Sequence, residues 1–165
     1  MSEPAAHAVQ DFYPDDFAHC YGCGRLNRHG LHLKTRYEGD ETVSRFLPRP
    51  YHIAVPGYVY GGLLASLVDC HAMGTAAAAA ERRAGREIGA GPAPRFVTAA
   101  LRVDFVAPTP QGVELEIRGR VKEMSERKAV IEASVSAQGR VTVRAEVVAV
   151  RMPAAMAART GSLHT

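Results

Sequence analysis

A single carboxylate stands in the longest apolar stretch of the chain. Between Gly61 and Ala80 the only formally charged residue is Asp69. A carboxylate in such surroundings is costly to bury unless it is hydrogen-bonded, paired or protonated, and isolated buried acids concentrate at functional sites. Asp69 is therefore the first candidate for chemistry. The structural alternative is a helix aspartate that is held by a backbone group or an arginine.

Two glycines, Gly61 and Gly62, open the same stretch. Glycine suits a helix start whose backbone must approach another group closely, although the pair also fits a simple tight entry into the helix. Ser66 lies one turn before Asp69 on the same helical face. Its hydroxyl could bond the carboxylate or the carbonyl four residues earlier, and the second is the commoner arrangement.

A second group of reactive residues lies near the N-terminus, where Cys20 and Cys23 form a Cys-x-x-Cys flanked by histidines. Such a motif can contribute to a tetrahedral zinc site. No second Cys-x-x-Cys follows, and the remaining cysteine, Cys70, falls inside the apolar stretch. We therefore expect no metal, with a zinc site as the weaker alternative. Cys70 and its neighbour His71 point in different directions on a helix, which excludes a Cys–His couple within one chain.

Composition narrows the class of protein. The 165 residues suit one domain, and the formal net charge of +3 without a Lys/Arg block gives no indication of nucleic-acid binding. We expect no membrane segment, because the apolar stretch contains Asp69, His71 and many small residues. No basic leader precedes an apolar run at the N-terminus, and three cysteines do not form a disulfide framework. These features favour a cytoplasmic protein.

Hydrophobic periodicity predicts two strands, one long helix and then four strands. The expected elements are strands at 31–37 and 42–47, a helix at 61–83, and strands at 97–105, 113–121, 129–137 and 141–151. A helix that is apolar nearly all round must be enclosed, and a curved antiparallel sheet of about six strands could wrap it. We therefore predict an α+β fold with a lead-in at 1–18, one domain at 19–151 and a tail at 152–165.

The element order and several motifs resemble a known enzyme family. Gly61-Gly62 is followed by an aspartate seven residues after the second glycine. Further matches are the lead-in Cys20-Tyr21-Gly22-Cys23-Gly24 and the strand that carries Thr98, Val103-Asp104-Phe105, Pro108 and Pro110. Over roughly residues 19–151 the chain is similar to the hotdog-fold acyl-CoA thioesterases of the phenylacetate-pathway type.

This resemblance implies hydrolysis of acyl-CoA to a free acid and CoA without a metal, with CoA as part of the substrate and no other cofactor. By position, Asp69 would be the general base or the nucleophile. The backbone N–H of Gly61, or of Gly62, would form the oxyanion hole at the helix N-terminus. Thr98 matches a threonine that orients water or the carboxylate, although alone it also fits an ordinary strand position. The glycine-rich lead-in would be a structural cap near the mouth of the site.

Helix geometry adds a prediction about assembly. Gly61 and Asp69 are eight residues apart, so they lie about 12 Å apart along one helix. One carbonyl group cannot contact both. If both act, the helix N-terminus must come from a second subunit, which predicts a homodimer and allows pairing of dimers into a tetramer.

The chain departs from this family at the approach to the helix. Tyr60 stands where relatives usually carry histidine, and Ile53-Ala54-Val55 is apolar where relatives often carry Asn or Gln. His52 is a nearby polar candidate for substrate binding, as is Tyr60 through its hydroxyl. These departures leave a second interpretation open, a non-hydrolytic protein of the same fold that binds acyl-CoA or a small apolar ligand.

Overall fold

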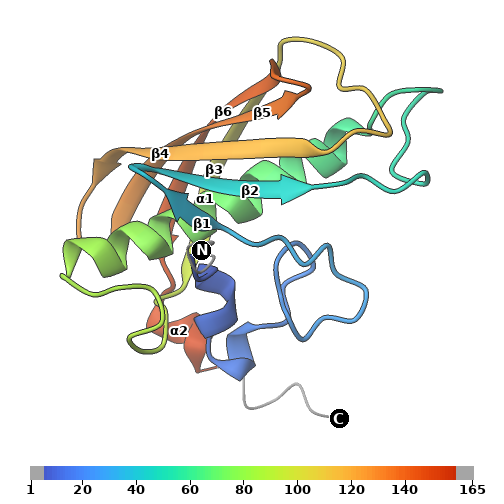
Figure 1. Cartoon of the computed structure of the whole chain (residues 1–165). Coiled ribbons are helices and arrows are strands. Elements are labelled where there is room, and N and C mark those ends of the chain that lie inside the picture. Colours follow the sequence, from blue (N-terminus) through green and yellow to red (C-terminus); the bar gives the residue numbers. More distant parts are fainter. Residues whose placement is uncertain (1–5, 159–165) are drawn as a thin grey trace, which may run out of the picture.

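The computed structural model describes residues 6–158, in which one long helix lies across a six-stranded antiparallel sheet (Figure 1). The helix is α1 (Gly61–Arg83), and the strand order in the sheet is β1-β2-β4-β5-β6-β3. The strands are β1 (Arg36–Glu38), β2 (Glu41–Phe46), β3 (Phe96–Phe105), β4 (Leu115–Met124), β5 (Lys128–Ala137) and β6 (Arg140–Arg151). The predicted α+β hotdog architecture is confirmed.

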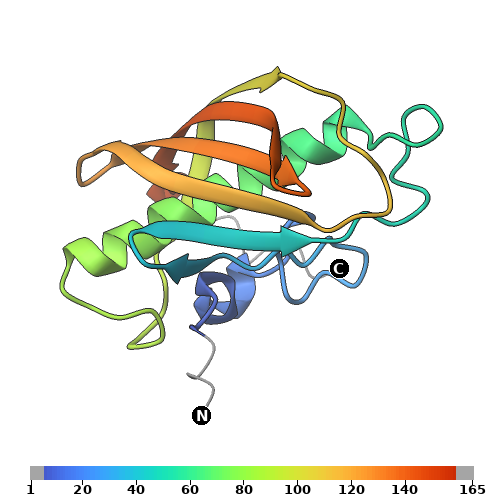
Figure 2. The ribbon, with the colours of Figure 1, turned by 45° about the horizontal axis from the view of Figure 1, so that its top comes forward.

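Helix α1 is the core of the molecule. The strands curve over one side of it (Figure 2), and Leu67, Val68, Ala72 and the first alanines of the run at 76–80 are fully buried. Small side chains in that run let the sheet approach the helix closely. By length and composition α1 could pass for a membrane span, but 83% of its most apolar 18-residue window is buried inside the protein. We therefore assign it as a core helix.

The segment before β1 covers the other side of α1. It contains two short 3-10 helices, Val9–Phe12 and Asp15–Phe17, and the Tyr13 side chain joins the same hydrophobic core as α1. Gln10 donates a hydrogen bond to Thr35 Oγ1 (2.9 Å), and its amide oxygen accepts one from the Thr35 N–H (2.8 Å). The lead-in is therefore more tightly packed than its polar sequence indicates.

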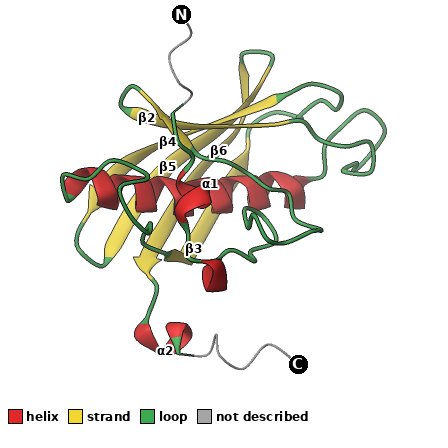
Figure 3. Cartoon of the chain, turned by 60° about the horizontal axis from the view of Figure 1, so that its bottom comes forward, coloured by secondary structure: helices red, strands yellow, loops and turns green. Residues whose placement is uncertain are grey.

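Residues 31–35 differ from the predicted strand. Only Arg36–Glu38 pairs with β2, whereas the N–H groups of Leu31 and Leu33 donate to the carbonyls of Tyr21 (2.8 Å) and Gly22 (3.0 Å). The alternating pattern correctly indicated a buried Leu33, but its backbone partners belong to the lead-in loop rather than to the sheet. The remaining strands begin and end within three residues of the predicted bounds. The tail adds one short helix, α2 (Ala154–Ala157), where the chain leaves β6 (Figure 3).

Strand β3 forms one edge of the sheet and, within residues 6–158, pairs only with β6. Residues 98–102 are exposed on both faces, and Leu101 and Phe105 keep 41% and 55% of their surface accessible. A long apolar edge with unpaired backbone groups is a ready surface for pairing with a second strand. In the single chain neither face of this strand is buried over residues 98–102.

Gly74 gives a stability test of the contact between α1 and the lead-in. Alanine normally stabilises a helix by about 1 kcal/mol relative to glycine, but a Cβ on Gly74 would lie 2.6 Å from both Gln10 Nε2 and Thr35 Oγ1. We expect Gly74→Ala to destabilise the protein by about 1–3 kcal/mol and to lower Tm by roughly 3–10 °C. Gly91→Ala is the control, because nothing lies within 4 Å of its Cβ position. An unchanged or higher Tm for Gly74→Ala would contradict this packing.

Candidate functional site

Asp69 lies on the side of α1 that faces the edge strand β3. It is partly buried, and its Oδ1 accepts a hydrogen bond from the Thr98 hydroxyl. Burial raises the pKa of Asp69 above its ordinary value, the Thr98 hydrogen bond lowers it, and the nearby Cys20 raises it. The predicted pair of Asp69 and Thr98 is therefore brought together by the fold. A partly desolvated carboxylate of raised pKa is a better proton acceptor than an exposed one.

The N-terminus of α1 has no side-chain cap. Tyr60 occupies the N-cap position without a capping hydrogen bond. The N–H groups of Leu63 and Leu64 donate to the Tyr60 carbonyl, but those of Gly61 and Gly62 have no acceptor among residues 6–158. Two free N–H groups at the positive end of a 23-residue helix favour an anion. This is the electrostatic character that an oxyanion hole requires.

The Tyr60 ring folds back over Gly62. A Cβ on Gly62 would lie 2.4 Å from the ring and 2.6 Å from the Tyr60 hydroxyl. Glycine at this position therefore leaves room for the tyrosine, which remains 57% exposed. The Tyr60 hydroxyl therefore lies beside the start of the helix.

The two halves of the predicted site remain apart within one chain. Because α1 is one continuous helix, Gly61 and Asp69 keep the spacing of about 12 Å. Strand β3 runs beside the helix in the opposite direction. Thr98 contacts Asp69, and the Phe105 ring borders Gly61, where a Cβ would lie 3.4 Å from it.

Two further predicted residues have backbone roles. Ser66 donates its hydroxyl to the Gly62 carbonyl (2.9 Å), the alternative that the sequence favoured. His52 lies beside the helix start, where its carbonyl accepts the Tyr60 N–H (3.0 Å) and its Nδ1 accepts the Arg49 N–H (3.0 Å). Burial, and secondarily Arg49, lowers the pKa of His52, which favours the neutral ring.

Comparison with known proteins identifies the family. Residues 56–144 match the model of the thioesterase superfamily. A thioesterase superfamily protein from Shewanella loihica PV-4 is 46% identical, and the match covers 84% of this chain and 98% of that one with a TM-score of 0.65. The chain belongs to the thioesterase superfamily. This membership identifies it as a thioester hydrolase at the level of the family.

More distant solved structures share the fold. The PaaI protein of the phenylacetic acid degradation operon of E. coli is 15% identical, with 74% of this chain and 81% of that one covered and a TM-score of 0.60. The TT0310 protein from Thermus thermophilus is 24% identical, with 74% and 93% covered and a TM-score of 0.56. No curated protein matches the chain. The resemblance to phenylacetate-pathway-type thioesterases is thus confirmed for the fold.

The matched segment of this thioesterase superfamily member contains both halves of the site but leaves out the lead-in, since it begins at residue 56. Three free cysteines meet where the lead-in contacts α1: Cys20, Cys23 and Cys70 have their sulfur atoms within 4.8 Å of one another. Sequence spacing set Cys70 apart from the other two, and no signal in the sequence paired the loop with that turn of α1.

His71 has a structural role. It is fully buried toward the sheet, where the Ser44 hydroxyl contacts Nδ1 (2.7 Å) and the Thr42 hydroxyl contacts Nε2 (3.2 Å). Burial lowers the pKa of His71 to about 3, so the ring is neutral at physiological pH. Cys70 and His71 point to opposite layers, as the helix geometry predicted.

Proposed function

We propose that this thioesterase superfamily member hydrolyses acyl-CoA to the free acid and CoA, with Asp69 as the reactive carboxylate. The observation that carries the proposal is the hydrogen bond between Asp69 and Thr98. Asp69 is the one formally charged residue of the core helix between Gly61 and Ala80. Family membership supports thioester chemistry, and the acyl-CoA form of the substrate is part of the proposal.

The reaction needs one carboxylate and one oxyanion donor, and no metal takes part in it. With Asp69 as general base, water loses a proton to the carboxylate and attacks the thioester carbon. The carbonyl oxygen becomes an oxyanion that is stabilised by the Gly61 N–H, or by that of Gly62. Collapse of the tetrahedral intermediate breaks the C–S bond and releases CoA thiolate, which takes up a proton. In the alternative, Asp69 attacks the carbon directly, the C–S bond breaks to release CoA thiolate, and water then hydrolyses the resulting anhydride to the free acid and the Asp69 carboxylate.

Edge-to-edge pairing of two β3 strands would complete the site. In an antiparallel pair whose two-fold axis passes between Leu101 and Arg102, Thr98 faces the partner's Phe105. Because Thr98 holds Asp69 and Phe105 borders Gly61, this register brings the carboxylate of one subunit to the helix start of the other. The exposed apolar edge of β3 supports this homodimer.

Tyr60 takes the place of the family's usual histidine in this scheme. Its hydroxyl lies beside Gly62, as judged by the 2.6 Å approach to a Cβ there. It can therefore donate a second hydrogen bond to the thioester oxygen next to the backbone N–H. The same cover over the helix start also suits the alternative function, a protein that binds acyl-CoA without hydrolysing it.

Asp69→Asn tests the reactive carboxylate. The amide keeps the size of the side chain but cannot accept the proton, so we expect the release of free CoA from an acyl-CoA panel to slow by roughly 100- to 10,000-fold. Asp40→Asn is the control, because Asp40 is a fully exposed carboxylate in a turn. Its turnover should match that of the wild type. Equal turnover by wild type and Asp69→Asn would exclude the role of Asp69. Binding without any turnover by the wild type would favour the ligand-binding alternative.

Gly61→Pro removes one N–H group at the helix start. Proline is tolerated at the first helical position, and the extended backbone of Tyr60 (φ −61°, ψ 127°) suits a residue before proline. We expect kcat to fall roughly 100- to 1,000-fold with little change in Tm. Gly61→Ala keeps the N–H and meets only an ordinary contact of 3.4 Å with Phe105, so it should stay active. Full activity of Gly61→Pro would show that the Gly61 N–H does not contact the oxyanion.

Mixed subunits test whether the site is shared. Asp69→Asn and Gly61→Pro chains, each nearly inactive alone, should regain about a quarter of wild-type activity after unfolding and refolding together in equal amounts. In a mixed dimer, one site receives both changes and the other receives neither. The mixtures must be shown to be dimeric by size-exclusion chromatography. If such mixtures do not regain activity, Asp69 and Gly61 do not act together in a site shared between subunits.

A further inference from the structure

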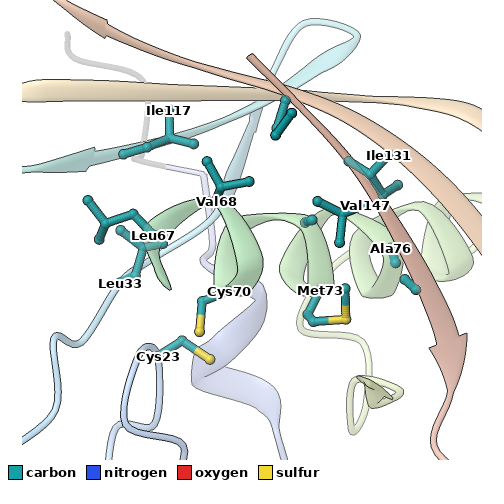
Figure 4. Packing of buried hydrophobic residues seen from close by; sticks show 14 of the residues in the cluster. Cys23, Leu33, Leu67, Val68, Cys70, Met73, Ala76, Ile117, Ile131 and Val147 are labelled. Carbon is teal, nitrogen blue, oxygen red and sulfur yellow. The ribbon is translucent and has the colours of Figure 1, made fainter. Parts of the chain in front are cut away.

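The three cysteines form a compact cluster between the lead-in loop and α1. The sulfur atoms of Cys20 and Cys70 are 3.7 Å apart, and all three lie within 4.8 Å of one another. Cys23 and Cys70 are buried, and Cys20 is partly exposed. Figure 4 shows Cys23 and Cys70 on the side of the helix opposite Ile131 and Val147 of the sheet. The cluster is thus separate from the hydrogen bonds of His71 on the sheet side.

We propose that Cys20, Cys23 and Cys70 bind one thiophilic metal ion, with Zn²⁺ as the best fit, in contrast to our expectation of no metal from the sequence. At a Zn–S distance of about 2.3 Å, two thiolates of a tetrahedral site lie about 3.8 Å apart. The Cys20–Cys70 separation of 3.7 Å fits this edge without movement of the chain. A disulfide would instead need the two sulfurs at about 2.05 Å. Because Cys20 is partly exposed, the fourth position would be open to water.

The loop turns tightly at Cys20, the first of the three proposed ligands. The Gly24 N–H donates to the Cys20 carbonyl (2.8 Å), which closes the turn. A Cβ on Gly24 would lie 2.4 Å from the Cys20 nitrogen, so glycine is required for this turn.

Close packing brings the third ligand to the loop. A Cβ on Gly22 would lie 2.1 Å from the Cys70 sulfur, so only glycine lets the loop pass this near the helix. The ion therefore joins the lead-in to α1 at the residue next to Asp69. This proposal does not depend on thioester hydrolysis.

A buried cation lies beside the cluster. The Arg95 guanidinium stacks over the Tyr13 ring at 4.3 Å and is close enough to Cys23 and Cys20 to affect their electrostatics. Arg95 Nη1 and the Tyr13 hydroxyl are buried without a hydrogen-bond partner among residues 6–158, although the two groups are near each other. Three thiolates on a divalent ion leave one net negative charge, which the Arg95 cation compensates.

Cobalt titration of the reduced, chelator-treated full chain tests the site. We expect one equivalent of Co²⁺ to give thiolate-to-metal charge-transfer bands with intense tetrahedral d–d bands, and one equivalent of Zn²⁺ to remove them. Cys20→Ser, Cys23→Ser and Cys70→Ser should each weaken Co²⁺ binding by more than roughly 100-fold. Loss of a residue that only hydrogen-bonds a ligand already costs up to about 100-fold, and loss of a ligand itself should cost more. Met73→Leu is the matched control. It removes a buried thioether sulfur, one turn after Cys70, that is not a thiol. It should bind as the wild type does.

A second measurement covers variants that fail to fold. Zn²⁺ should raise the Tm of the wild type and of Met73→Leu, and leave that of Cys20→Ser unchanged. Because Cys20 is partly exposed, its serine variant is expected to fold even if Cys70→Ser does not. Absence of saturable one-to-one binding by the wild type, or unchanged binding by Cys20→Ser, would overturn the proposal. Formation of a disulfide within the cluster when the reduced chain is exposed to dissolved oxygen, with neither Co²⁺ nor Zn²⁺ bound, would also overturn it and assign a redox pair.

Discussion

Enclosure of α1 is the constraint on which the rest of the structure depends. The helix is apolar around most of its circumference, so it must be covered on every side to exclude water. The curved sheet covers one side, and the lead-in, with Tyr13 and Leu33 in the common core, covers the other. Glycines at the tightest approaches, such as Gly74 under Gln10 and Thr35, set how close these layers can come.

The same enclosure determines where chemistry can occur. Most of α1 is inaccessible, but its N-terminus and the side facing the edge strand β3 remain open, and these are the places of Gly61 and Asp69. In the proposed mechanism, a carboxylate partly removed from water and an uncapped helix start are complementary parts of one site. Their spacing along a rigid helix keeps them apart in a single chain. The proposed dimer would therefore connect catalysis with assembly, because the strand that hydrogen-bonds Asp69 also has the exposed edge for a second subunit.

The lead-in shows where reasoning from sequence stops. The alternation through Leu31, Leu33 and Thr35 correctly predicted inward side chains, since period-two burial is a local property. It assigned those residues to the sheet, whereas the N–H groups of Leu31 and Leu33 donate to the carbonyls of Tyr21 and Gly22 and that of Thr35 donates to Gln10 Oε1, because extended chains of the same pattern can bond either partner.

The sequence by itself determined the core helix and its bounds, the number and order of the strands, the pair of motifs Gly61-Gly62 and Asp69, and through them the family. These follow from periodicity, turn formers and residue spacing along one element, all of which are local. Only the tertiary structure decided that Thr98 reaches Asp69, that β3 is an edge, and that Cys70 meets Cys20 and Cys23. Each of these contacts joins residues at least 29 positions apart or depends on strand order, and packing rather than local pattern selects such partners.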